Sequence, residues 1–259
     1  MSFRSHLIHK IRTYYRETPT ALKCLGYLEN KYPFVKPTID HTAYRFINRS
    51  DCNQFVKNAD PQYVLGGHLV FPLKNTDKFP KEAYWYKHPF YSRMFVSFLD
   101  IKDNSIKDNS IKDHDIKFIK SILDSNSTKL EKYNLLKNHD QYLAWTCTWG
   151  ESINHLAFDL SLYPDPFEKI IEEMKDDLGL EMNQCNLNNP VNPLIMVSND
   201  LLLQQASTKS DLVDGIPKAY IEFVHRSYDP LIGKPRDGFD TFSANGIFES
   251  TNFNQQAVS

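Results

Sequence analysis

Three side chains that can bind a metal ion lie far apart in the sequence, each within a segment of strand composition. They are His41, His155 and Glu222, separated by 114 residues (155 minus 41) and by 67 residues (222 minus 155). Side chains two apart in a strand point to the same face of a sheet. Under that rule each of the three has small or polar neighbours on its own face and apolar residues on the other. Each segment can therefore turn one metal-binding group toward a shared site.

Two imidazoles and one carboxylate form a donor set with a defined chemistry. They make the facial triad of non-haem Fe(II) oxygenases, which leaves coordination positions open for a chelating substrate and dioxygen. We therefore expect one divalent ion at this site. Fe(II) is the expected metal, and another divalent ion is the alternative. The competing interpretation makes each of the three a hydrogen-bonded structural side chain of its strand.

Two arginines accompany the triad on its predicted faces. Arg45 follows His41 by four residues, about 13 Å along an extended strand, and its long side chain can lean back to hold a substrate carboxylate. Arg226 shares a face with Glu222 and can orient that carboxylate or contact the substrate. A structural arginine at the edge of the sheet explains Arg226 equally well.

Two other residues invite a chemical role. His68 follows two glycines that would allow close approach to a metal, but a bend made by these glycines is the simpler interpretation. Cys147 lies within the aromatic segment 145–149, where a buried thiol explains it without nucleophilic chemistry. The sequence contains no phosphate-binding loop, dinucleotide fingerprint or G-x-S-x-G motif, which argues against those chemistries.

Local patterns predict the elements that would position these residues. Two helices are expected in the first thirty residues, the second with Thr18 as N-cap and Pro19 in its first position. A later helix has Asp165 as its predicted N-cap, followed by Pro166 and then by Glu168 at the third position of a capping box. A helix is also predicted over 127–144, followed by an aromatic connector over 145–149. Strands are predicted over 38–47, 66–71, 93–99, 152–160, 201–205 and 218–226, which gives an α+β protein with one curved mixed sheet.

Residues 101–115 contain a near-perfect tandem pentapeptide, IKDNS-IKDNS-IKDHD. Three polar copies are too few for a solenoid, so we expect a surface insertion. We interpret residues 1–259 as one catalytic domain, with N-terminal helices over 1–35 and a metal-binding core over 36–253. The aromatic, glycine-punctuated tail 238–253 is expected to pack over this core.

Composition narrows the class of protein. The 259 residues are 41% hydrophobic and 24% charged with a formal net charge of −2, as expected for a globular chain with a sizeable core. No basic cluster is interleaved with aromatic residues, so no nucleic-acid partner is expected. No apolar run reaches the roughly eighteen residues of a membrane span, and the N-terminus lacks a secretion signal. Four cysteines without a CxxC pair favour a cytoplasmic protein.

Four ordered motifs resemble one enzyme family. They are IDHTAYR at 39–45, INHL at 153–156, YIEFVHR at 220–226 and FSANGIFES at 242–250. Together they are similar to the 2-oxoadipate dioxygenase/decarboxylase family, also called hydroxyglutarate synthase. The resemblance implies the vicinal-oxygen-chelate, or glyoxalase-like, fold of paired βαβββ modules, in which a curved mixed β-sheet with flanking helices encloses the metal. It also implies that His41, His155 and Glu222 bind iron, that Arg45 clamps a substrate carboxylate and that Ser243 meets the far end of the substrate.

The resemblance predicts a non-haem Fe(II) enzyme that uses dioxygen to decarboxylate and hydroxylate a small 2-oxo dicarboxylic acid, as in the conversion of 2-oxoadipate to 2-hydroxyglutarate. One departure bears on the substrate. Only 21 residues separate Glu222 from Ser243 (243 minus 222), where longer bacterial members carry a large insertion. The exact 2-oxo acid and the oligomeric state stay open. So do two alternatives, a glyoxalase-like metal-dependent isomerase or lyase and a non-enzymatic protein that binds a metal or a 2-oxo acid.

Overall fold

The structure is a computed structural model that describes residues 3–71, 79–99, 113–184, 192–198, 203–231 and 233–239, together with 241 and 244. Its helices are α1 (Phe3–Glu17), α2 (Pro19–Lys31), α3 (Arg49–Lys57), α4 (Asp113–Leu123), α5 (Lys129–Lys137), α6 (Gln141–Trp149) and α7 (Phe167–Leu178). Its strands are β1 (Thr38–Phe46), β2 (Val64–Val70), β3 (Lys81–Lys87), β4 (Arg93–Leu99), β5 (Ile153–Asp159), β6 (Met196–Val197), β7 (Leu203–Ser207), β8 (Asp211–Val213), β9 (Ile216–Arg226), β10 (Tyr228–Asp229) and β11 (Lys234–Pro235). The strands predicted from the sequence are confirmed, with shifts of up to two residues at their ends. Five further strands in the described part of the chain were not predicted, namely β3, β6, β8, β10 and β11.

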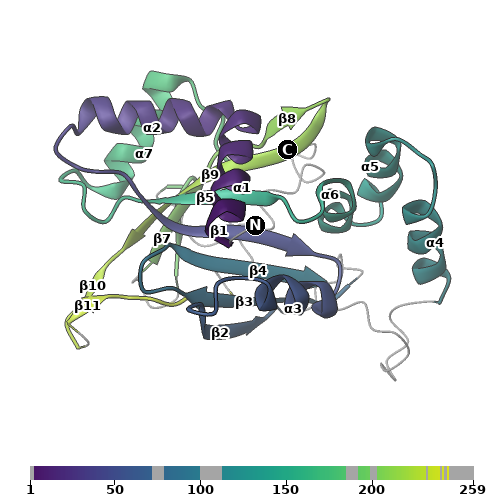
Figure 1. Ribbon diagram of the computed structural model, residues 1–259. Coiled ribbons are helices and arrows are strands. Elements are labelled where there is room, and N and C mark those ends of the chain that lie inside the picture. Colours follow the sequence, from purple (N-terminus) through teal and green to yellow (C-terminus); the bar gives the residue numbers. More distant parts are fainter. Residues whose placement is uncertain are drawn as a thin grey trace.

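A curved mixed sheet organises the described residues, in the order β2-β3-β4-β1-β5-β9-β7-β6 with β8 paired to β9 (Figure 1). The sheet has two halves. The first consists of β1, β2, β3 and β4, with α3 following β1 in the chain. The second consists of β5, β6, β7 and β9, with α7 following β5. In each half the first and last strands pair in parallel, β1 with β4 and β5 with β9. The two halves meet where β1 and β5 pair antiparallel. This repeated βαβββ arrangement is the fold that the motifs predicted.

Helices cover one face of the sheet and leave the other face for the site. Alternate strand residues such as Tyr44, Leu156 and Phe223 are buried in a large apolar core together with residues of α1, α2, α3 and α7. Burial of these side chains supplies the main driving force for the fold. The helices α4, α5 and α6 lie beyond one end of the strands (Figure 1). No helix of the described part is long and apolar enough to cross a membrane.

Two β-bulges interrupt the pairing of β1 with β5. Ile39 faces Phe158 and His41 faces Ala157, so Asp40 is an extra residue on β1. Further along, the extra residue on β5 is Asn154, immediately before His155. A bulge changes the direction of the side chains around it. As a result, both residues that precede the predicted histidine ligands leave the regular alternation of their strands.

Helix boundaries follow the predictions in part. Pro19 does open α2, but the side chain of Thr18 makes no capping hydrogen bond. Instead, Asp211 of β8 accepts hydrogen bonds from the backbone N–H and the hydroxyl of Thr20, at 3.0 and 2.7 Å. The first turn of α2 is therefore capped by a distant strand, which local sequence cannot reveal.

The predicted capping box before α7 is wrong. Pro166 has an extended backbone (φ −56°, ψ 144°) and is the N-cap, so the helix begins one residue later than predicted. Asp165 instead binds Tyr32 and Lys169. Glu168 accepts a hydrogen bond from Gln204 of β7. Contacts between elements thus take the side chains that a capping box would use.

The predicted connector over residues 145–149 is also wrong, because this segment is the second half of α6. Asp140 caps the helix by accepting a hydrogen bond from the backbone N–H of Leu143 at 3.0 Å. Gly150, with φ 55°, ends it. The helix predicted over 127–144 is accordingly divided into α5 and α6 by the turn before Asp140. Of the repeat segment 101–115, residues 101–112 lie outside the described residues, and 113–115 open α4.

Candidate metal centre

The structure brings His41, His155 and Glu222 together on the inner face of the sheet. Their nearest ligand atoms all lie within 4.8 Å of one another, and all three side chains are buried. The two Nε2 atoms are 3.2 Å apart, and the carboxylate oxygens of Glu222 lie 3.7 Å from Nε2 of His41 and 3.4 Å from Nε2 of His155. The three residues come from three strands that are neighbours in the sheet, β1, β5 and β9. The two halves of the sheet meet between β1 and β5. The cluster is able to hold one metal ion.

Hydrogen bonds at the far side of each ring determine which nitrogen faces the cluster as an acceptor. Nδ1 of His41 donates to Asp40 at 2.8 Å, because an ionised carboxylate can only accept. Nδ1 of His155 lies 3.2 Å from Oδ1 of Asn154 and donates to it. With both rings neutral, the lone pairs of the two Nε2 atoms point into the same small space. Two acceptors cannot bond each other, whereas one cation would satisfy both.

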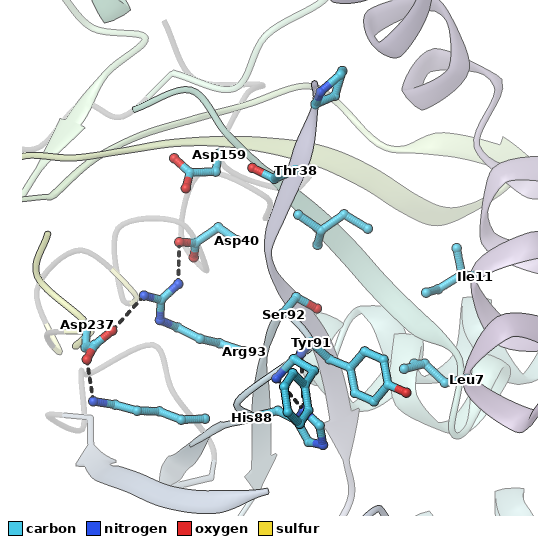
Figure 2. A pocket seen from close by; sticks show the side chains of 14 residues that line it. Leu7, Ile11, Thr38, Asp40, His88, Tyr91, Ser92, Arg93, Asp159 and Asp237 are labelled. Atoms are coloured by element: carbon cyan, nitrogen blue, oxygen red, sulfur yellow. Dashed lines mark hydrogen bonds and ion pairs between the residues drawn. The ribbon is translucent and has the colours of Figure 1, made fainter. Parts of the chain in front are cut away.

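Asp40 anchors this arrangement through a buried ion network. Arg226 binds it through two hydrogen bonds, Nε to Oδ2 at 2.6 Å and Nη2 to Oδ1 at 3.0 Å. Arg93 donates to Asp40 at 2.9 Å and to Asp237 at 2.8 Å. Figure 2 shows these three side chains, which line a neighbouring pocket. Burial alone would raise the pKa of Asp40, but Arg226 and the hydrogen bond from His41 bring it well below its ordinary range. The carboxylate therefore stays ionised and holds His41 in one tautomer and orientation.

Glu222 has the opposite electrostatic balance in the free protein. Burial raises the pKa of its carboxyl group, and His41 and a hydrogen bond from Gln205 oppose this shift only in part. Burial likewise lowers the pKa of His155 well below its ordinary value, and His41 and Arg45 lower it further. A divalent cation would favour the carboxylate and the neutral imidazole at once. The donor set thus fits a metal better than it fits a proton.

Apolar and aromatic side chains enclose the cluster. The pocket that contains the triad is also lined by Phe95, Gln205, Phe239 and Ala244. The Phe239 ring meets His41 edge to face, with ring centroids 4.9 Å apart, and packs against Phe95 at 5.2 Å. Such walls exclude water and strengthen electrostatic interactions inside the pocket.

Arg45 is buried on the same face of β1 as His41, as the strand alternation predicted. Its guanidinium lies over the rings of Tyr142 and Trp145 of α6, 5.1 and 5.6 Å from their centroids. Its charge acts on the pKa of His155. The aromatic faces of two α6 residues therefore hold a cation whose charge reaches His155.

Arg226 and Ser243 are the other two residues predicted to bind substrate. Besides binding Asp40, Arg226 donates to the backbone carbonyls of Arg236 and Gly238, at 3.0 and 2.8 Å. These contacts give Arg226 a structural role behind His41, and its predicted contact with substrate stays a prediction. Ser243 lies outside the described residues, as does most of the tail 238–253.

The rival candidates lie apart from the triad. The ring of His68 binds Glu82, Nε2 to Oε2 at 2.6 Å. A Cβ atom on Gly66 or Gly67 would lie 2.1 or 2.4 Å from the indole of Trp85, so the glycines are required by this ring and not by a ligand of His68. Burial raises the pKa of Cys147 to about 12, which makes its thiol a poor nucleophile.

Several residues of the site were not predicted, namely Asp40, Asn154, Phe95, Gln205 and Phe239. The first two carried a partial signal, since each is a polar residue directly before a histidine, but only the bulge turns it toward that histidine. Phe239 lies in the aromatic tail that was expected to pack over the core. Gln205 and Phe95 carried no signal, because their positions depend on pairing between distant segments.

Comparison with known proteins agrees with this geometry. No family model matches the chain. A curated protein of Oryza sativa subsp. japonica, named 2-oxoadipate dioxygenase/decarboxylase, chloroplastic/amyloplastic, is 28% identical in an alignment of 144 residues that covers 48% of this chain and 38% of that protein. Its chloroplastic namesake in Arabidopsis thaliana is 30% identical in an alignment of 141 residues that covers 46% of this chain and 36% of that protein. The matched segments thus span less than half of the length of these relatives.

Solved structures match over more of the chain. Hydroxyglutarate synthase from Oryza sativa, crystallised with 2-oxoadipate, has a TM-score of 0.75 at 23% identity, covering 98% of this chain and 93% of that chain. A putative glyoxalase superfamily protein from Ralstonia eutropha JMP134 has a TM-score of 0.61 at 16% identity, covering 90% and 83%. The chain therefore has the predicted glyoxalase-like fold and resembles 2-oxoadipate dioxygenases/decarboxylases in sequence.

Proposed function

We propose that this protein is a non-haem Fe(II) enzyme that decarboxylates and hydroxylates a 2-oxo dicarboxylic acid with dioxygen. With 2-oxoadipate, one dioxygen would be consumed, and 2-hydroxyglutarate and carbon dioxide would form. The observation that carries the proposal is the convergence of two imidazole lone pairs and one carboxylate in a buried pocket. Hydroxyglutarate synthase, which shares the fold, was crystallised with 2-oxoadipate, and this supports the substrate class.

The protein side chains would hold the reactants and control their surroundings. His41, His155 and Glu222 would bind the metal, which when present orients a chelating 2-oxo acid and activates dioxygen. Asp40 fixes His41 by accepting from its Nδ1, and the ion pair with Arg226 keeps that carboxylate charged. Phe95 and Phe239 keep water away from the reacting groups.

Arg45 would bind a carboxylate of the substrate, in accordance with the prediction from the sequence. The aromatic rings of Tyr142 and Trp145 support its guanidinium without neutralising its charge. Replacing Arg45 by Met should lower kcat/KM at least roughly thirtyfold, as expected when one partner of a buried charged pair is removed. The iron content should not change. Equal losses of iron and activity would instead assign Arg45 a structural role.

Oxygen uptake tests the proposed reaction. Protein without a histidine tag would be loaded with Fe(II) and mixed with 2-oxoglutarate, 2-oxoadipate or 2-oxopimelate in an oxygen electrode. We expect carbon dioxide release equal to oxygen uptake for at least one acid. Glu222→Gln should neither take up oxygen nor release carbon dioxide. Glu82→Gln, which changes a carboxylate bound to His68 and Arg49, is the matched control and should stay active.

Two outcomes would contradict the proposal. Turnover without oxygen would favour the glyoxalase-like isomerase or lyase, and binding of the acids without turnover would favour a binding protein. The cytoplasmic location is a separate prediction, since the names of the curated relatives place those proteins in plastids.

A further inference from the structure

Gln205 of β7 has one half of its side-chain amide satisfied and the other half not. The residue is only 4% exposed and lines the same pocket as His41, His155 and Glu222. Its Nε2 donates to Oε1 of Glu222 at 2.7 Å. Its own Oε1 is buried and has no hydrogen-bond partner among the described residues. A side chain that lines the candidate metal pocket thus has one unused acceptor.

The orientation of this amide is fixed by its neighbour. A carboxylate accepts hydrogen bonds and cannot donate, so the NH2 group of Gln205 must face Glu222 and the carbonyl must face elsewhere. Buried acceptors without a partner are destabilising and rare, and each needs an explanation. A ligand that brings a donor into the pocket would supply the missing bond.

We propose that Gln205 determines specificity by accepting a hydrogen bond from the hydroxyl group of a 2-hydroxy acid, an inference that rests on the proposed function. A 2-oxo acid offers keto and carboxylate oxygens to this position, and these only accept. The 2-hydroxy acid of the same length offers a donor instead, and the product of the proposed reaction is such an acid. Gln205 therefore favours the 2-hydroxy acid over the 2-oxo acid by roughly tenfold, the effect of one hydrogen bond in a dry site.

Calorimetric titration of the Mn(II)-loaded full chain under argon tests this preference. The ligands are 2-oxoglutarate and 2-hydroxyglutarate, which differ only at C2, and no turnover is needed. The measured quantity is the Kd of the 2-oxo acid divided by the Kd of the better-bound 2-hydroxyglutarate enantiomer. At saturating Mn(II) this ratio is independent of any change in metal affinity. We expect Gln205→Met to lower the ratio roughly tenfold.

Two further variants separate the acceptor from the support that Gln205 gives Glu222. Gln205→Lys keeps a donor for Glu222 but lacks an acceptor, so it should lower the ratio as well. Gln204→Met is the matched control, because Gln204 points to the other face and donates to Glu168 at 2.6 Å. Its ratio should stay within about twofold of the wild type, a difference well below one hydrogen bond.

The outcomes distinguish this inference from the proposed function. A wild type that binds 2-oxoglutarate, with an unchanged ratio in Gln205→Met, would overturn the role of Gln205 alone. A shift confined to Gln205→Met and absent from Gln205→Lys would also overturn it, since lost support of Glu222 would then be the cause. A wild type that binds neither acid would overturn this inference, whereas the proposed function would be overturned separately, by the absence of oxygen uptake with all three 2-oxo acids.

Discussion

The two halves of the sheet have the same topology but contribute unequally to the candidate metal centre. In the first half His41 faces Arg93 of β4, and in the second half His155 faces Tyr220 of β9. Two residues further along these last strands, the equivalent positions hold Phe95 and Glu222. The first half therefore contributes one candidate ligand and an apolar wall, whereas the second half contributes two candidate ligands. Two halves of the same topology thus give three donor side chains, and the fourth equivalent position is the apolar Phe95.

The same comparison explains the residues beside the two histidines. Asp40 and Asn154 occupy equivalent bulges, and each accepts a hydrogen bond from Nδ1 of the following histidine. Asp40 has Arg93 and Arg226 as partners. The positions equivalent to these arginines in the other half are Tyr220 and Leu99, which carry no charge. A buried carboxylate needs a cation, so an aspartate is tolerated at the first bulge and a neutral amide suits the second.

The largest effect is expected from removing the carboxylate that distinguishes the second half. Glu222→Gln keeps the shape of the side chain but loses the charge that offsets a divalent cation. We expect Mn(II) affinity to fall at least roughly a hundredfold, beyond the usual effect of changing a residue that only supports a ligand. Competition with a metal-sensitive dye would measure this, with Glu82→Gln as the control. Retained affinity in Glu222→Gln would remove Glu222 from the ligand set.

The next largest effect is expected from making the first half resemble the second. Asp40→Asn leaves the buried Arg226 without its carboxylate, which should lower the free energy of unfolding by roughly 3–5 kcal/mol. Denaturant unfolding of the metal-free protein would measure this loss. A change below about 1 kcal/mol, the size of an exposed ion pair, would show that the network contributes little to stability.

The ion pair of Asp40 with Arg226 also predicts that stability depends on pH. Because the pKa of Asp40 is lowered on folding, the carboxylate stabilises the native state fully above its unfolded pKa of about 4, and this stabilisation is lost as the pH falls below that value. Metal-free wild type should therefore lose stability in acid more steeply than Asp40→Asn. Parallel curves of unfolding free energy against pH would contradict the assignment.

The reverse exchange sharpens the comparison with a smaller effect. Asn154→Asp places a carboxylate at the second bulge, where the equivalent positions offer no arginine. We expect the metal-free protein to lose roughly 1–3 kcal/mol of unfolding free energy, the cost of burying a poorly partnered polar group. Denaturant unfolding would again be the measurement. A stabilised Asn154→Asp would mean that the two bulges do not differ in their need for a cation.

The smallest effect is expected at the apolar wall. Phe95→Leu keeps the position apolar but removes the ring that packs on Phe239, so a loss of about 1 kcal/mol in unfolding free energy is expected. Mn(II) affinity should stay within about threefold of the wild type, since no ligand changes. A large loss of affinity would mean that the wall also positions His41.

The triad was predictable because the alternation is regular from each histidine onward in β1 and β5, and because the four motifs occur in order. The hydrogen bonds of Asp40 and Asn154 were not, since regular alternation points each residue away from its neighbouring histidine and only a bulge brings the two together. Gln205 depends on the register of β7 against β9, which local sequence does not determine. The helical state of residues 145–149 depends on caps at both ends and on packing of the tryptophans, which overrode their aromatic composition.

The pairing of β1 with β5 would give a bound ion a structural role besides the proposed chemical one. His41 belongs to one half, and His155 and Glu222 belong to the other, so a bound cation would fasten the two halves across the ladder that joins them. A ligand that binds only the folded state stabilises it, by a free energy that grows with the ratio of ligand concentration to Kd. Removal of the metal by a chelator would thus destabilise the pairing of β1 with β5 first. Increased protease cleavage in these two strands would report the loss of the metal without an activity assay.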